Sequence, residues 1–226
     1  MTETLAWATA IYEAVKGPAW DALQRFGFRL ARQFPAENLW LLKQPHDRLT
    51  YPFCVYWFVQ AMFDREQKEG RKADWFLWIE DDIMPPDDVY DTLRAAADPE
   101  TKPFVSALAY CRTPPYGPGI ASVRKLGNVT TRVQWADAPT SGTHPCDSVG
   151  MCAALFHRSL FDRVPEPWFG VAPPSANSGI GPDAWWCDKL LKHGIQPYVC
   201  CDAQVDHIGP SIRVDRRSAE RWRAAQ

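Results

Sequence analysis

The stretch DWFLWIEDDIMPP, residues 74–86, decides the fold class of this chain. Its first part, Asp74–Ile79, is a nearly continuous apolar run, which is typical of a strand buried on both faces of a parallel sheet. Three acids follow at positions 80–82. The prolines and aspartates at 85–88 then favour the start of a helix, through the fixed proline φ and the helix dipole. The stretch therefore predicts a strand, an acidic loop and a helix, in that order.

Strand-like and helical patterns alternate along the rest of the chain. Apolar runs predict strands at 5–12, 38–43, 104–110 and 198–201, with shorter strand-like pieces within 123–137 and a further apolar run at 149–156. Helical spacing or helix start and stop signals predict helices that begin near 18, 52, 89 and 183. Residues 112–122 and 165–181 are rich in Pro and Gly and are expected to be loops, the second long enough to serve as a lid. This alternation predicts one α/β domain with a mostly parallel sheet and helices on both faces, in which ligands bind at the carboxyl ends of the strands.

Composition limits the possible partners and compartment. The 226 residues suffice for one α/β domain, which we place at 1–210, followed by an Arg-rich tail at 211–226. Lys and Arg total 25 against 27 for Asp and Glu, so overall charge does not favour nucleic acid or a membrane surface. The seven cysteines lack paired CxxC spacing and are expected to be buried thiols. Because neither a signal peptide nor a run of about 20 apolar residues is present, we expect a cytoplasmic protein without a membrane span.

The acids after the central strand suggest a metal site. Burying several carboxylates together is costly unless a cation neutralises them. A hard cation such as Mn²⁺ or Mg²⁺ takes oxygen ligands and keeps positions open for phosphate oxygens. We therefore expect Asp82 to bind a metal, whereas Asp87 and Asp88 fit a helix start. The alternative is a solvated loop whose acids cap the next helix.

The segment WIEDDIMPPDDVYDTL, residues 78–93, resembles the metal-binding segment of GT-A glycosyltransferases, especially the compact family 2-like enzymes of bacteria and phages. The resemblance implies a Rossmann-like α/β sheet and a metal bound by Asp82. It also implies that Glu80 lies near the donor ribose or the water shell of the metal, with Asp81 beside the donor. Glu80 stands where the family has Asp, which is a departure from the pattern.

Two downstream motifs extend this resemblance. The helix-start motif GPDAWWCD, residues 181–188, is similar to the family's Glu-Asp motif, which implies that Asp183 is the general base on the acceptor hydroxyl. Pro182 stands where the family often has Glu. The alternative for Asp183 is a favourable charge at a helix N-terminus. One of the adjacent Trp185 and Trp186 is expected to pack inward, while the other stacks on an acceptor or sugar.

The terminal motif Asp206-His207-Ile208-Gly209 is similar to the family's His-x-Gly, which implies that His207 is a second protein ligand of the metal. Before residue 74 the resemblance is architectural. It implies that Tyr12 and Glu13 hold the nucleotide base and that Arg48 approaches the diphosphate.

Together these motifs predict a metal-dependent, inverting transfer of a sugar from a nucleotide-sugar, a UDP-sugar by family expectation, to a hydroxyl acceptor; a retaining outcome stays open. The acceptor is either a hydroxymethylated base in phage DNA, which would place the enzyme in the host cytoplasm, or a glycan. Arg112 and Arg158 could join the Arg-rich tail in contacting DNA phosphates. The alternatives from other classes are a nucleotidyltransferase and a non-catalytic module that binds sugar nucleotides or DNA. A nucleotidyltransferase usually has a Gly-rich basic loop after the first strand, but residues 12–18 are poor in Gly and Arg.

Overall fold

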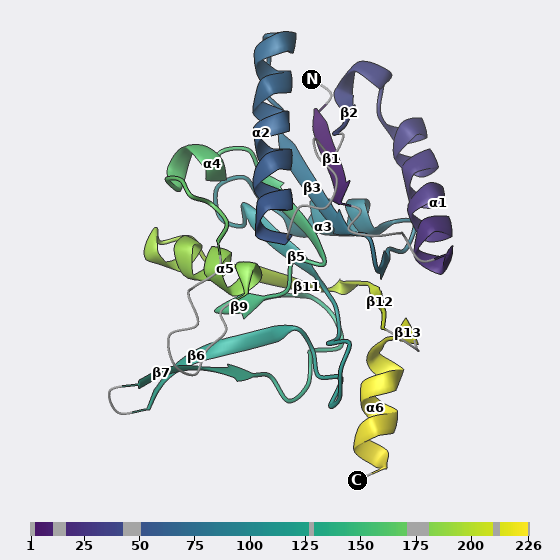
Figure 1. The fold of residues 1–226 in the computed structure, drawn as a ribbon, viewed down its shortest axis with the longest axis vertical. Coiled ribbons are helices and arrows are strands. Elements are labelled where there is room, and N and C mark those ends of the chain that lie inside the picture. The colour runs from purple at the N-terminus through teal and green to yellow at the C-terminus, as the bar shows by residue number, and fades with distance from the viewer. Residues whose placement is uncertain are drawn as a thin grey trace.

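A seven-stranded sheet forms the centre of the molecule (Figure 1). The computed structural model describes residues 3–10, 17–42, 51–126, 129–170, 181–209 and 213–225. In spatial order, the strands are β2 (Leu39–Leu41), β1 (Leu5–Ala10), β3 (Trp75–Glu80), β10 (Ala153–His157), β5 (Phe104–Leu108), β11 (Tyr198–Gln204) and β8 (Thr143–Pro145).

The sheet is mostly parallel, as the sequence predicts. Strands β1, β2, β3, β5 and β11 run in one direction, whereas β10 and the edge strand β8 run against them. Because β10 is antiparallel to β3 and pairs Ala153 with Ile79, the residues that precede β10 lie beside the carboxyl end of β3. This inserted strand therefore brings a segment from the middle of the chain to the edge where an α/β sheet binds ligands.

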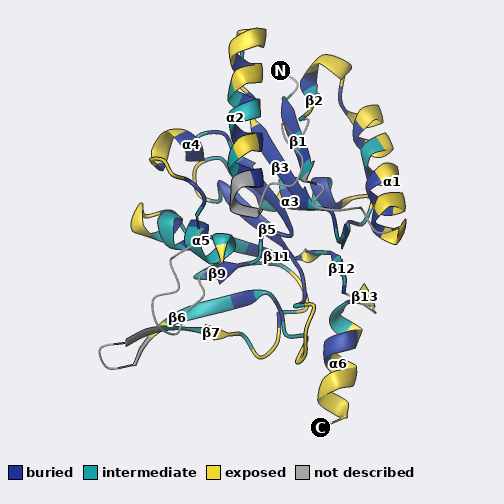
Figure 2. Cartoon of the chain, in the orientation of Figure 1, coloured by how far each residue is buried: buried dark blue, intermediate teal, exposed yellow. Residues whose placement is uncertain are grey.

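Strand β3 is buried on both faces, as its apolar run predicts. Successive side chains of a strand point to opposite faces. Accordingly, Phe76 and Trp78 belong to one core, while Trp75, Leu77 and Ile79 belong to the core on the other face. Figure 2 shows these central strands as the continuous buried part of the chain. The adjacent Cys200 and Cys201 of β11 divide between the two cores in the same way.

Helices cover both faces of the sheet, which confirms the predicted α/β layering. Apolar residues of α1 (Gly17–Gln33) and α3 (Val89–Ala96) pack in the core that contains Trp75. Those of α2 (Tyr51–Glu69), α4 (Leu160–Arg163) and α5 (Pro182–Lys192) pack in the core that contains Trp78. Leu23, Phe26 and Leu30 show how the 3.6-residue period places one face of α1 against the sheet. A 3₁₀ turn at Ala36–Asn38 leads into β2.

Two small sheets lie beyond the carboxyl edge of the central sheet. One contains β13 (Arg213–Val214), β12 (Asp206–Ile208) and β4 (Ile83–Met84), and the other contains β7 (Val129–Gln134), β6 (Ile120–Leu126) and β9 (Ser148–Val149). The pairing of β12 with β4 sets His207 opposite Ile83, and the amide of Ile208 donates a hydrogen bond to the carbonyl of Asp82 at 2.8 Å. A segment near the C-terminus is thereby fixed beside the acidic loop that follows β3.

Several boundaries differ from the predicted ones. Strand β6 begins inside the segment 112–122, where the sequence predicts a loop, and β11 continues to Gln204 rather than ending at 201. The segment 211–226 contains β13 and a helix, α6 (Arg216–Ala224), whose start is closed by a capping box between Asp215 and Ser218. The domain boundary at 210 stays a prediction.

The cysteines form no disulfide, and six of the seven are buried, as expected. Across the described ranges, no helix combines the length and the apolar character that crossing a membrane requires.

Candidate functional site

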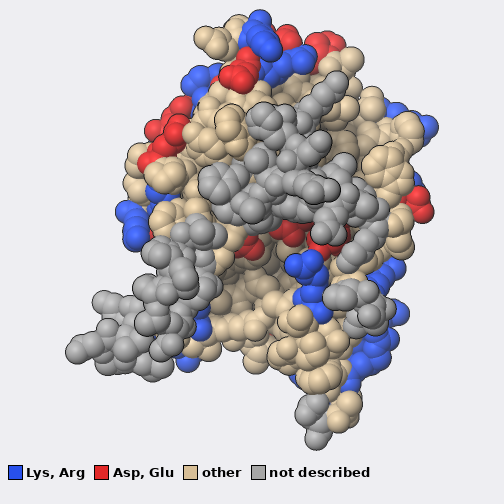
Figure 3. All heavy atoms as spheres, in the orientation of Figure 1, with Lys and Arg blue, Asp and Glu red and all other residues tan. Residues whose placement is uncertain are grey.

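A cavity of about 1060 Å³ lies at the carboxyl edge of the sheet. Its wall includes the acidic residues after β3, the start of α5, part of the β6–β7 hairpin and the segment that leads into β10. Figure 3 shows a hollow in this face, with acidic side chains at one rim and basic side chains next to them. Among the predicted site residues, those that line the cavity are Glu80, Asp81, Asp82, Arg112, Asp183 and His207.

The acids after β3 reach the cavity because the strand ends at Glu80 and the chain turns before β4. The amide of Glu80 donates a hydrogen bond to the carbonyl of Cys152 at 2.9 Å, which ties the end of β3 to the approach to β10. Asp81 is buried, with 9% of its surface exposed, and the Asp82 side chain is 14% exposed. Three carboxylates thus lie together in a largely buried position, where a positive charge is favoured.

His207 is held in one orientation by the backbone. Its Nδ1 lies 3.0 Å from the carbonyl oxygen of Tyr110, which can only accept, so Nδ1 carries a hydrogen and donates it. In a neutral ring, Nε2 then carries the lone pair that can bind a metal. This Nε2 is buried, has no hydrogen-bond partner among the described residues, and lies 3.5 Å from Oδ1 of Asp82. The predicted ligand pair Asp82 and His207 is therefore brought together in space.

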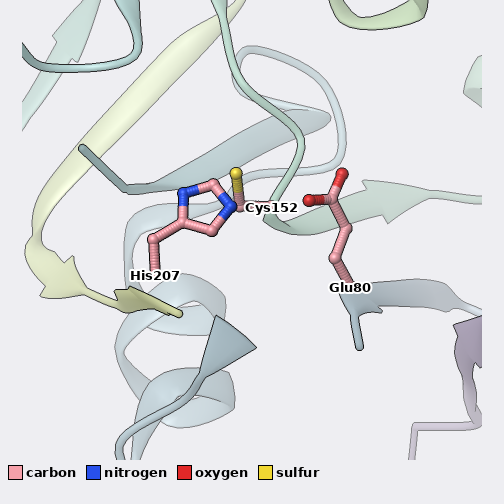
Figure 4. Close-up of side chains that lie close together, drawn as sticks. All are labelled: Glu80, Cys152 and His207. Carbon is pink, nitrogen blue, oxygen red and sulfur yellow. The ribbon is translucent and has the colours of Figure 1, made fainter. Parts of the chain in front are cut away.

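Cys152 lies at the same place, although none of the predicted metal ligands is a cysteine. Ligand atoms of Glu80, Cys152 and His207 all lie within 4.8 Å of one another (Figure 4). Burial raises the pKa of the Cys152 thiol well above its usual range, and the nearby carboxylates of Glu80, Asp183 and Asp82 raise it further. The same carboxylates also favour a cation at this place.

Asp183 lies in the first turn of α5, where its charge interacts favourably with the helix dipole. Its Oδ2 accepts a hydrogen bond from the amide of Met151 at 3.3 Å, and its side chain lines the cavity. A carboxylate held at a helix start and facing a cavity can accept a proton from a hydroxyl group within hydrogen-bond reach.

Two arginines add positive charge to the cavity wall. Arg112 pairs with Oδ2 of Asp82 at 2.5 Å, and its side chain is 52% exposed. Arg132, which sequence reasoning did not single out, lines the cavity from β7 and pairs with Asp188 of α5. One guanidinium, that of Arg112, therefore lies beside the acids that follow β3, and the other, that of Arg132, lies next to α5.

Some predicted site residues have other surroundings. Trp186 is fully buried against Phe156, Phe161 and Phe169, so it is the one of the two tryptophans that packs inward, and it is not placed to contact an acceptor. The indole of Trp185 lies next to Gly170, and Trp185 is not among the described residues that line the cavity. Tyr12, Glu13, Arg48 and most of the predicted lid at 165–181 lie outside the described residues.

Arg158 is not beside the cavity, which corrects its predicted contact with DNA phosphates. It is buried at the opposite edge of the sheet, beside the start of β3, where its Nε donates to Oε1 of Glu66 at 2.8 Å and its guanidinium lies 4.3 Å from the ring centre of Phe63. Arginines of the C-terminal segment also have partners within the chain. Arg213 pairs with Asp206, Arg216 donates to the carbonyls of Ala138 and Pro139, and Arg223 pairs with Asp137.

Comparison with known proteins supports the fold. No protein-family model and no curated protein matches the sequence. Among solved structures, A197 from STIV is similar over 96% of this chain and 92% of its own, with a TM-score of 0.56 and 14% identity. At that identity the similarity establishes a common fold and leaves the activity open.

Two further similarities are weaker. A glycosyltransferase involved in the glycosylation of the major capsid of PBCV-1 matches 73% of this chain and 69% of its own, with a TM-score of 0.35 and 9% identity. A nucleoside-diphosphate-sugar pyrophosphorylase from Vibrio cholerae matches 99% of this chain and 80% of its own, with a TM-score of 0.36 and 12% identity. TM-scores below 0.5 do not establish a common fold, so the site itself must carry the functional argument.

Proposed function

We propose that this protein is a GT-A-type glycosyltransferase that moves a sugar from a nucleotide-sugar, a UDP-sugar, to a hydroxyl acceptor with the aid of a divalent metal ion. The observation that carries the proposal is the convergence of Asp82, Asp183 and His207 in one cavity at the carboxyl edge of the sheet. These three residues come from separate segments, and each has the chemistry that its predicted role needs. The size of the cavity also suits a nucleotide-sugar together with part of an acceptor.

The donor atoms fit a divalent ion. The buried Nε2 of His207 has no hydrogen-bond partner among the described residues, and a metal ion would satisfy it. Asp82 and Glu80 supply carboxylate oxygens next to it, as Mn²⁺ or Mg²⁺ requires. When bound, such an ion neutralises charge on the departing diphosphate.

The remaining roles fall to the chain's own side chains. Asp183 accepts the proton of the acceptor hydroxyl, since its carboxylate faces the cavity from a fixed helix start. A single carboxylate in this role favours an inverting transfer. Asp81 and Glu80 stand beside the donor, and the guanidinium of Arg112 lies close enough to Asp82 to contact the same diphosphate.

The acceptor is a hydroxyl group of either hydroxymethylated DNA or a glycan. For DNA, the exposed guanidinium of Arg112 at the cavity supports a phosphate contact. The C-terminal arginines Arg213, Arg216 and Arg223 give less support, because each contacts another part of the chain. An assay that offers both hydroxymethylated DNA and glycans to the enzyme distinguishes the two acceptor classes.

The first test is metal-dependent use of the donor. Purified protein is incubated with Mn²⁺ and a panel of UDP- and GDP-sugars, and nucleoside diphosphate release is measured. Wild-type protein should release nucleoside diphosphate. Asp82→Asn should lower the rate by about 10²-fold or more, because the metal loses a negatively charged ligand. Asp88→Asn is the matched control, since Asp88 is an exposed acid just before α3 and does not line this cavity.

The outcomes separate the function classes. Equal release by wild type and Asp82→Asn would refute the assigned site. Binding of UDP-sugars by the folded protein without release, with either acceptor present, would favour a non-catalytic module. Formation of a nucleotide-sugar from a nucleoside triphosphate and a sugar phosphate would identify a nucleotidyltransferase.

A further inference from the structure

We propose that Cys152 is a ligand of the metal ion in this cavity, so that the site combines sulfur with oxygen and nitrogen donors. The inference rests on the metal site of the proposed function and adds to it the residue that sets metal preference. It follows from side-chain positions that none of the sequence motifs predicts.

The first observation is the spacing of three donor atoms. Atoms of Glu80, Cys152 and His207 lie within 4.8 Å of one another. Metal bonds of about 2.0–2.3 Å place two ligand atoms on one ion roughly 3 to 4.6 Å apart, depending on their angle at the ion. The three side chains are therefore within a small adjustment of a shared ion, and Figure 4 shows them converging from β3, from β12 and from the segment before β10.

The second observation is that His207 is aimed into this group. Its side chain is 9% exposed, its Nδ1 is fixed on the carbonyl of Tyr110, and its Nε2 has no hydrogen-bond partner among the described residues. A metal-binding imidazole commonly donates its other ring N–H to a carbonyl in this way. The position of His207 therefore indicates a bound ion at this place, and this indication does not depend on the cysteine.

The third observation is that the backbone fixes Cys152 relative to Glu80. The amide of Glu80 donates to the carbonyl of Cys152 at 2.9 Å, and Ala153 pairs with Ile79 in the adjoining strands. Cys152 lines the cavity although only 8% of its surface is exposed. Its thiol is thus held next to the carboxylate and is accessible to an ion that enters the cavity.

A sulfur ligand changes which ions the site prefers. Thiolates favour softer ions such as Zn²⁺ and Co²⁺, whereas carboxylates and water suit Mg²⁺ and Mn²⁺. Coordination deprotonates the thiol, so one proton passes from Cys152 to solvent for each ion bound and no redox change occurs. We therefore expect this protein to bind Zn²⁺ and Co²⁺ through sulfur and to discriminate against Mg²⁺ more strongly than an oxygen-and-nitrogen site would.

The test is spectroscopic and does not depend on turnover. Metal-free full-length protein is titrated with Co²⁺, and the near-ultraviolet charge-transfer absorption of a cobalt–thiolate bond is followed. Wild-type protein should develop this band with one equivalent of Co²⁺. Cys152→Ser should lose the band. Its Zn²⁺ affinity should fall by about tenfold or more, because loss of a residue that only supports a ligand already costs about tenfold and loss of the ligand itself should cost at least as much. The Mn²⁺ affinity should change much less.

Cys111→Ser is the matched control, because Cys111 also lines the cavity but is not one of the three clustered residues. This variant should keep the band. X-ray absorption of wild-type protein with one equivalent of Zn²⁺ provides a measurement that needs no variant, and it should show a sulfur neighbour at about 2.3 Å.

A band that survives in Cys152→Ser, or a zinc site without sulfur in wild type, would overturn the inference. Donor turnover with Mn²⁺ is measured on the same preparations to separate this result from the proposed function. A sulfur-bound metal without turnover would refute the transferase and keep the ligand assignment. Turnover with a sulfur-free metal site would refute the ligand assignment and keep the transferase.

Discussion

Replacing Asp183 by Asn tests whether this residue is the general base. The substitution keeps the size of the side chain and leaves an amide oxygen that can still accept from the amide of Met151. It removes the charge and the ability to take a proton. General-base contributions are typically about 10²- to 10⁴-fold in rate, or roughly 2.7–5.5 kcal/mol of activation free energy.

The effect on folding should be much smaller. The lost charge lies in the first turn of α5, where its interaction with the helix dipole contributes about 0.3–1 kcal/mol. For a domain of this size, such a loss lowers the melting temperature by about 4 °C at most. A large loss of rate with nearly unchanged stability is therefore the expected signature.

The assay measures nucleoside diphosphate release and thermal unfolding on the same preparations. Asp64→Asn serves as the control, since Asp64 is an exposed acid on α2 that does not line the cavity. If Asp183→Asn stays within about tenfold of wild type at saturating acceptor, the base assignment is refuted. The helix-dipole explanation of this residue would then suffice.

Three further predictions concern stability and are measured by denaturant unfolding. Arg158→Met should lower the free energy of unfolding by about 3–5 kcal/mol, because Glu66 is left as a buried charge without its partner. Adding Glu66→Leu to this variant should restore most of the lost stability. Equal stability of wild type and Arg158→Met would contradict the prediction. Glu3→Gln should be less stable than wild type at neutral pH. Hydrogen bonds from Arg94 lower the pKa of the Glu3 carboxyl below 4.5, so its contribution is present above pH 4.5 and is lost as the pH falls through the lowered value; a difference that persists in acid would argue against the pair. Asp215→Ala should cost about 1 kcal/mol by removing the cap of α6, seen as a loss of helical signal, and an unchanged midpoint would show that the cap contributes nothing.

The central part of the fold is predictable because β3 carries its own signal. Its apolar run requires burial on both faces, and the acids that follow can only lie where the strand ends. The spacing of Leu23, Phe26 and Leu30 likewise places α1 against the sheet. Where periodicity or burial dictates structure locally, the sequence and the structure agree.

Pairings between distant segments are less predictable. The direction of β10 is set by its pairing partners rather than by its own residues, so the position of Cys152 beside Glu80 has no local signal. For the same reason, the sequence alone does not show that Arg158 points into the core toward Glu66. Two adjacent tryptophans must point in different directions on a helix, but the sequence does not tell which of Trp185 and Trp186 is the buried one.

The central claim is that the protein transfers a sugar from a donor bound in this cavity to a hydroxyl acceptor. The most direct measurement is the mass of the acceptor after incubation with Mn²⁺, UDP-sugars and either hydroxymethylated duplex DNA or a set of glycans. We predict that one acceptor gains the mass of a sugar residue with wild-type protein, and that the gain is abolished in Asp82→Asn and kept in Asp88→Asn. Folded, metal-bound protein that adds no sugar to any acceptor and releases no nucleoside diphosphate would contradict the account.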